Sequence, residues 1–156
     1  KKSKSHSLRI IREVLSFEPT GKGTNIRSAL EFLNNAVKKR AIVFLMSDFN
    51  DSGYDKILRI IGKRHDLVGV VLADPGENQI PSIGLAQFID PETNEEILID
   101  TSNSSFREWY RKKREEFEKK RKSIFISSRL DSVFINTNES YIKPLVNFFK
   151  NREKRW

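Results

Sequence analysis

The sequence predicts an α/β fold in which helices alternate with parallel strands. Two apolar blocks, Ala41–Met46 and Leu67–Ala73, are too short for stable helices and too continuously apolar for half-exposed strands. They are therefore predicted to be buried strands of a parallel sheet. A segment with helical periodicity lies before the first block and another between the two, which requires crossover helices that pack on the sheet.

Two helices are expected before the first strand, at Ser5–Phe17 and Asn25–Lys39, with a turn at Pro19–Thr24 between them. The first has Leu8, Ile11 and Leu15 on one face. Thr24 has a suitable side chain for capping the second helix. In that helix the apolar residues follow a helical spacing at Ile26, Leu30, Leu33 and Val37.

The remaining elements continue the alternation and add one hairpin. A helix at Tyr54–Arg64 is expected to join the two strands, with His65 at its end. The elements expected after the second strand are a β-hairpin of Gly84–Asp90 and Glu96–Asp100 around Pro91–Asn94, a helix at Ser105–Lys122, a strand at Ser132–Asn136 and a helix at Tyr141–Asn151.

The long helix at Ser105–Lys122 is predicted to begin with a capping box of Ser105 and Glu108. Its four aromatic side chains are expected to pack on the sheet, and they are Phe106, Trp109, Tyr110 and Phe117.

Composition limits the function classes. A chain of 156 residues is enough for one domain, and it has no cysteine, which excludes a disulfide scaffold, a thiol nucleophile and a thiolate zinc site. Only His6 and His65 could serve a histidine-based metal site. No apolar run approaches the roughly 18 residues of a membrane helix. The chain begins at Lys1 in a polar stretch, and we expect it to be a segment of something longer.

The net charge of +8 is distributed unevenly. Residues 1–4, 107–122 and 150–156 together carry +11, so the rest of the chain carries −3. The basic character therefore belongs to the two ends and one helix, where a solvated charged face explains it more simply than a nucleic-acid site does.

Asp48 and Thr24 are the candidate ligand-binding residues. Asp48 directly follows the first strand, at the edge where ligands bind in open α/β sheets. A carboxylate and a hydroxyl are suitable oxygen ligands for Mg²⁺. Each residue also has a simpler interpretation, because Thr24 can cap a helix and Asp48 can cap the amides of its own loop.

Several motifs together resemble one known family. The combination is similar to the later part of a von Willebrand factor A-like domain, and more closely to the bacterial domain-of-unknown-function 58 family. The motifs that carry this resemblance are Gly23-Thr24-Asn25, Ala41-Ile-Val-Phe-Leu-Met-Ser-Asp48-Phe, Arg64-His65-Asp66, Asp74-Pro75, Leu98-Ile-Asp100-Thr-Ser102 and Tyr141-Ile-Lys-Pro-Leu-Val-Asn-Phe-Phe149.

The resemblance implies a three-layer α/β/α, Rossmann-like sheet of the von Willebrand factor A type, with an added β-hairpin. Residues 1–156 would form one partial domain without an internal boundary. Such domains hold a metal ion with an Asp-x-Ser-x-Ser motif, a threonine and an aspartate, and Thr24 and Asp48 match the last two. The first motif would lie upstream of Lys1 on a central strand. The resemblance therefore implies Mg²⁺ in the intact protein and no metal in this fragment.

The same resemblance implies a non-enzymatic protein-interaction module in the bacterial cytoplasm, acting with a MoxR-type AAA+ ATPase. If central strands are missing, the edge of Ala41–Met46 is left unpaired and invites self-association. The alternative function is a basic nucleic-acid-binding module. It would use the helix at Ser105–Lys122, whose candidate phosphate-binding residues are Lys112, Lys113, Arg114, Lys119, Lys120, Arg121 and Lys122.

Three other patterns resemble ligand sites. Asp100-Thr-Ser102-Asn-Ser104 fits Asp-x-Ser-x-Ser, but its order along the chain is wrong and a cluster capping the long helix explains it. Asp48–Gly53 resembles half of a calcium loop, yet Arg59 occupies the position of its last ligand. Gly21–Thr24 lacks the spacing of a phosphate loop.

Overall fold

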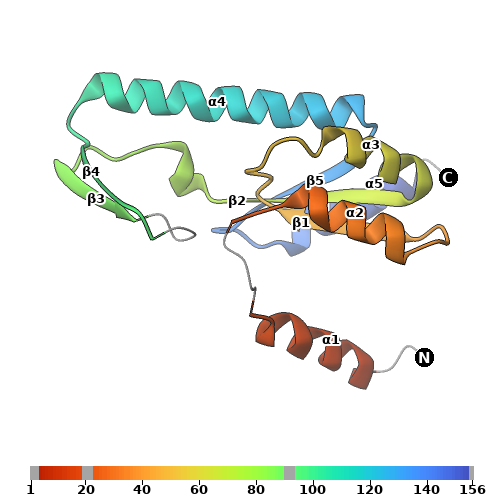
Figure 1. The fold of residues 1–156 in the computed structure, drawn as a ribbon. Coiled ribbons are helices and arrows are strands. Elements are labelled where there is room, and N and C mark those ends of the chain that lie inside the picture. The colour runs from red at the N-terminus through yellow and green to blue at the C-terminus, as the bar shows by residue number, and fades with distance from the viewer. Residues whose placement is uncertain (1–3, 19–22, 90–93, 155–156) are drawn as a thin grey trace.

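The computed structural model describes residues 4–18, 23–89 and 94–154 and confirms an α/β fold (Figure 1). Its centre is a parallel three-stranded sheet in the order β1 (Ile42–Ser47), β2 (Asp66–Ala73) and β5 (Asp131–Asn136). The predicted strands are therefore present and parallel, and β2 lies between the other two. The turn predicted at Pro19–Thr24 lies largely outside the described residues.

Two apolar clusters hold the helices on opposite faces of this sheet. On one face, α2 (Ile26–Ala36) and α3 (Asp55–Arg64) pack with β2 through Leu30, Leu58 and Val71. On the other face, α5 (Ile142–Glu153) packs on β2 and β5 through Leu145 and Phe148. The central residues of β2, 67–71, are buried because both clusters meet on this strand.

Strand β1 is an edge strand within the described residues, since it pairs with β2 alone. The prediction that it is buried was wrong, because one of its faces is exposed and the other, with Val43 and Leu45, is only half-buried. Ile42, Phe44 and Met46 point to the face of α5, and Met46 is 67% exposed. Helix α5 covers β2 and β5 and reaches β1 through the edge-to-face contact of Phe149 with Phe44, whose ring centroids lie 6.2 Å apart.

The predicted hairpin forms a separate antiparallel pair, β3 (Leu85–Ile89) and β4 (Glu96–Asp100). Of the expected turn at Pro91–Asn94, only Asn94 is described. A short 3₁₀ helix, η1 (Pro75–Asn78), follows β2. The long helix α4 (Ser104–Ser127) runs from the hairpin to the parallel sheet (Figure 1).

Helix α4 differs from the prediction in its length and its contacts. It continues to Ser127 rather than Lys122, because buried Phe125 and half-buried Ile124 pack on the sheet. The aromatic side chains were predicted to pack on the sheet, but Phe106, Trp109 and Tyr110 face the hairpin and the loop after β2. The periodicity identifies an apolar face correctly, but it does not show which element that face meets.

Helix α1 (Lys4–Ser16) has no buried residue, and its predicted apolar stripe of Leu8, Ile11 and Leu15 is exposed. Figure 1 shows this helix set apart from the sheet. None of the described helices is long and apolar enough to cross a membrane.

Helix α2 ends at Ala36, three residues earlier than predicted. Val37 has extended backbone and donates its N–H to the carbonyl of Leu33. Arg64 stabilises this end of the helix, because its guanidinium donates to the carbonyl oxygen of Asn34 at 2.9 Å and to that of Lys38 at 3.1 Å.

Candidate functional site

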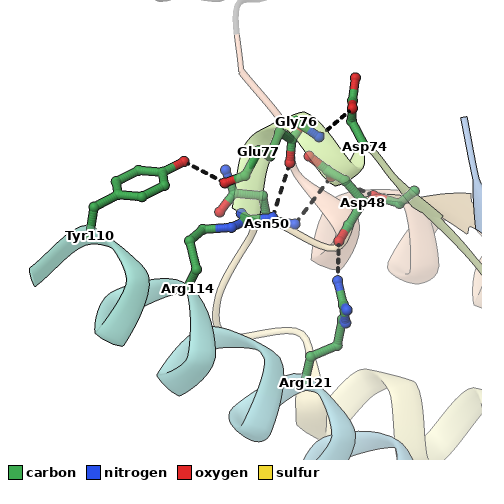
Figure 2. Close-up of polar contacts among 9 residues, drawn as sticks. Asp48, Asn50, Asp74, Gly76, Glu77, Tyr110, Arg114 and Arg121 are labelled. Carbon is green, nitrogen blue, oxygen red and sulfur yellow. Dashed lines mark hydrogen bonds and ion pairs between the residues drawn. The ribbon is translucent and has the colours of Figure 1, made fainter. Parts of the chain in front are cut away.

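The loops that follow β1 and β2 lie at the same edge of the sheet, because carboxyl ends of adjacent parallel strands are neighbours. Figure 2 shows Asp48 from the first loop beside Asp74, Gly76 and Glu77 from the second. Side chains of α4 reach both loops. We consider this edge of the sheet the candidate functional site.

Asp48 organises its own loop, as the simpler interpretation predicts. Its Oδ1 accepts the backbone N–H of Asn50 at 3.1 Å and the hydroxyl of Ser47 at 3.2 Å. The Ser47 hydroxyl oxygen in turn accepts the N–H of Phe49 at 2.9 Å. Asp48 is exposed, so its carboxylate is accessible from solvent.

Asp51 joins this loop to the start of α2. Its Oδ2 accepts the backbone N–H of Ile26 at 2.8 Å, although the two residues are 25 positions apart. This hydrogen bond brings the segment that contains Thr24 to the loop that contains Asp48. Sequence reasoning missed Asp51, and its only signal was a carboxylate three residues after Asp48 in a polar loop.

Thr24 was predicted to cap α2, but the capping residue is Asn25. The Asn25 Oδ1 accepts the N–H of Ser28 at 2.8 Å, and the helix begins at Ile26. Both side chains are suitable caps, so the sequence alone could not choose between neighbours. Thr24 is exposed, and Asn25 takes the capping role that was predicted for it.

The described part of the chain has no group of three or more histidine, aspartate or glutamate side chains that could hold an ion. Thr24 and Asp48 carry oxygen atoms of the kind that Mg²⁺ prefers. The proposed metal role of these two residues stays a prediction.

We expect this chain to bind Mg²⁺ with a dissociation constant weaker than about 1 mM, because two protein ligands leave most of its coordination to water. Isothermal titration calorimetry measures this directly, with Asp48→Ala as the comparison. Micromolar binding that Asp100→Ala abolished would contradict the expectation and would assign the metal to the motif at Asp100–Ser104.

Arg121 of α4 holds the loop after β1 in place. Its Nη1 donates to the carbonyl oxygen of Asp48 at 3.1 Å (Figure 2), and the residue is only 5% exposed. The guanidinium also lies over the rings of Phe117 and Phe134, at 5.5 and 5.6 Å. Burial lowers the pKa of Arg121. This residue is a structural support and is not accessible to phosphates.

A second arginine of α4 holds the loop after β2. Arg114 Nη2 lies 3.0 Å from Glu77 Oε2, and the Tyr110 hydroxyl donates to the carbonyl oxygen of Glu77 at 2.8 Å (Figure 2). The aspartate at the end of β2, Asp74, accepts the N–H of Gly76 at 2.8 Å and so caps η1. Helix α4 therefore positions both loops of the candidate site.

The motif at Asp100–Ser104 has the structural role that the simpler interpretation predicts. Asp100 Oδ1 accepts the N–H of Ser102 at 2.9 Å, and buried Thr101 donates to the carbonyl of Gly84 at 2.6 Å. Asn103 caps α4 by accepting the N–H groups of Ser105 and Phe106. The capping box predicted for Ser105 was wrong, because Asn103 already fills the capping position.

Glu108, the other residue of the predicted capping box, pairs with Lys112 at 2.9 Å instead of reaching the helix start. The hydrogen bond and charge of Lys112 lower the pKa of Glu108.

Tyr54 lies beneath the loop after β1, and burial raises the pKa of its hydroxyl while the charge of Arg121 opposes the rise. The folded state therefore favours the neutral phenol. Its stabilising contribution is present below the unfolded pKa of about 10 and is lost as the pH rises through the higher folded value.

The free energy of unfolding is therefore expected to fall less at alkaline pH for Tyr54→Phe than for wild type, and urea unfolding across a pH series measures this fall. Tyr141→Phe changes an exposed tyrosine and is the control. Its free energy of unfolding should fall with pH as that of wild type does. Equal declines for all three proteins would contradict the prediction.

Comparison with known proteins identifies the family. Comparisons with curated proteins and with solved structures find no match. Residues 1–120 match a family described as "Protein of unknown function DUF58", and this stretch includes Thr24, Asp48, the hairpin and most of α4. Since the match covers well over half of the sequence, the chain belongs to the DUF58 family.

Proposed function

We propose that the chain is a non-enzymatic protein-interaction module of a bacterial von Willebrand factor A-like protein. It acts in the cytoplasm with a MoxR-type AAA+ ATPase, and its contact surface is the edge of the sheet around Thr24 and Asp48. Membership of the DUF58 family supports this proposal, together with the similarity of the Thr24 and Asp48 segments to those of von Willebrand factor A-like domains.

The observation that carries the proposal is the hydrogen bond between Asp51 and Ile26 at 2.8 Å. It draws together two segments that are far apart in the sequence and that carry the second and third parts of the expected metal motif. An exposed carboxylate held at the carboxyl end of a parallel sheet is well placed to meet a ligand or partner. In this proposal, Mg²⁺ belongs to the intact protein, with further ligands from outside this chain.

The test measures binding of the chain to a purified MoxR-type AAA+ ATPase from the same bacterium by biolayer interferometry. We expect Asp48→Ala and Asp51→Ala each to weaken binding by about ten-fold, a loss of about 1.4 kcal/mol. Asp55→Ala is the matched control, since this aspartate lies on α3 and its carboxylate is a long 4.0 Å from Arg59. Failure of the ATPase to bind, or equal binding by all variants, would contradict the proposal.

Most basic side chains of α4 already form ion pairs or are buried, which argues against the nucleic-acid alternative. Arg111, Lys112, Lys113 and Lys122 each pair with a glutamate of the same helix. Arg114 pairs with Glu77, and Arg121 is buried. Of the candidate phosphate-binding residues, Lys119 and Lys120 have no ion pair among the described residues. Two lysines are a small contribution to phosphate binding.

We therefore expect weak duplex binding with a shallow salt dependence. With about two phosphate contacts, the slope of log K against log salt is expected near −2, because each contact contributes about −0.9. Fluorescence anisotropy with a labelled duplex across a salt series measures this slope. Micromolar affinity at about 150 mM salt, with a steep slope lost in a Lys119→Ala/Lys120→Ala variant, would favour the nucleic-acid function instead.

A further inference from the structure

An apolar groove adjoins the candidate site and lies between the loop after β2, the hairpin and the first turns of α4. Its volume is about 780 Å³, within the range of ligand sites in proteins. Three parts of the chain form its walls: the loop after β2, the inner face of the hairpin and α4. The lining residues include Asp74 of the loop, Phe88 and Ile97 of the hairpin, and Trp109 of α4.

The side chains that line this groove are unusually apolar for an exposed surface. Trp109 is 54% exposed and stacks on Phe106 with ring centroids 5.8 Å apart. Ile97 is 57% exposed and is paired in register with Phe88, so both point from the hairpin toward the same side. Exposed apolar and aromatic side chains gathered in a hollow are typical of a binding surface.

The groove also lies in the most acidic part of the chain. Residues 74–100 include seven aspartate or glutamate residues and no lysine or arginine, although the whole chain carries +8. Asp74 lines the groove and makes no ion pair with any described residue. Most of the basic residues of the adjoining turns of α4 already pair with glutamates, as Lys112 does with Glu108. The acidic charge at Asp74 is therefore left to attract a cation.

We propose that this groove binds a short segment of a partner protein that combines apolar side chains with lysine or arginine. The apolar side chains pack between Ile97 and Trp109, and the cation approaches the carboxylate of Asp74. A cation over the indole face of Trp109 adds to the attraction, because tryptophan is the strongest of the aromatic partners for a cation. The groove shares the loop after β2 with the candidate site but includes neither Asp48 nor Asp51, so variants at Ile97 test it independently of the function proposed above.

The test uses the fluorescence of Trp109 as a reporter. The chain has two tryptophans, Trp109 and Trp156, so the Trp156→Phe protein reports on the groove alone. The probes are two synthetic peptides of the same length, one of leucine, phenylalanine and lysine, the other with glutamate in place of lysine. We expect the lysine peptide to shift the Trp109 emission and to bind at least ten-fold more tightly than the glutamate peptide.

Variants in the same background locate the binding. Ile97→Asn should abolish binding, and Asp74→Asn should weaken it by about three- to ten-fold. Leu98→Asn is the matched control, because Leu98 is the next residue of β4, is 68% exposed and points to the opposite face of the hairpin. Thermal unfolding of each variant shows whether the fold is retained.

Several outcomes would overturn the proposal. Equal binding of the two peptides would show that the groove does not select a cation. An equal loss of binding in Leu98→Asn would show that the peptide does not bind in the groove. Binding of benzyltrimethylammonium in place of the lysine peptide, with the same dependence on Ile97, would show a small-molecule site instead. A concentration-dependent dimer lost in Ile97→Asn, without peptide binding, would show that a second copy of the chain fills the groove.

Discussion

Replacing Phe49 by alanine is expected to lower the free energy of unfolding by about 3–5 kcal/mol, the usual cost of removing a buried phenylalanine ring. Phe49 is fully buried, although it belongs to the polar loop after β1. Its ring meets Phe125 at 4.8 Å and Tyr54 at 6.0 Å between centroids. The loss would leave a cavity where the loop, α3 and α4 meet. Urea unfolding followed by circular dichroism measures the change.

Two further variants at this position separate packing from backbone strain. Phe49 has a φ of 61°, a left-handed conformation that costs a non-glycine residue about 1–2 kcal/mol. Phe49→Gly should therefore be no less stable than Phe49→Ala, although glycine usually destabilises. Phe49→Leu should lose less than either, since it keeps most of the buried volume. A Phe49→Ala protein as stable as wild type would show that the ring does not anchor the loop.

Lysine in place of Phe44 is expected to suppress self-association of the chain. Within the described residues, one edge of β1 has no pairing strand and lies beside exposed Ile42 and Met46, which is a template for pairing with another chain. Phe44 is 44% exposed, so burying the rest of its ring in such a contact would contribute about 1 kcal/mol, and its loss should raise the dissociation constant by about five-fold. Sedimentation velocity across a concentration series measures the change.

The control carries the same substitution on another surface. Phe32→Lys changes a phenylalanine of α2 that is also exposed, and it should associate like wild type. If the wild-type chain is strictly monomeric at high concentration, the prediction is wrong. If Phe32→Lys and Phe44→Lys act equally, association depends on net charge and not on β1.

The parallel strands and the hairpin could be predicted because their signals are local. The apolar composition of Leu67–Ala73 is enough to predict a strand inside the sheet. The residue pattern of Glu96–Asp100 is likewise enough to predict a strand. Helix ends were less predictable. Asn25 and Thr24 have similar capping ability, and the added turns of α4 depend on where Phe125 packs.

The contacts that build the candidate site could not be predicted, because they join distant parts of the chain. Asp51 and Ile26 are 25 residues apart, and Arg121 and Asp48 are 73 residues apart. No spacing rule relates residues at such separations. The apolar face of α4 was visible in the sequence, but nothing there shows that Trp109 lies in a groove against the hairpin and not on the sheet.

The order of the strands also affects how the chain folds. Strands β2 and β5 are neighbours in the sheet, yet the whole of residues 74–130 lies between them. Their pairing must close a long loop, which slows folding relative to chains with local contacts. The entropic cost of loop closure rises slowly, by about 0.6 kcal/mol for each doubling of length. The inserted hairpin can therefore grow or shrink over evolution at little cost to the parallel sheet.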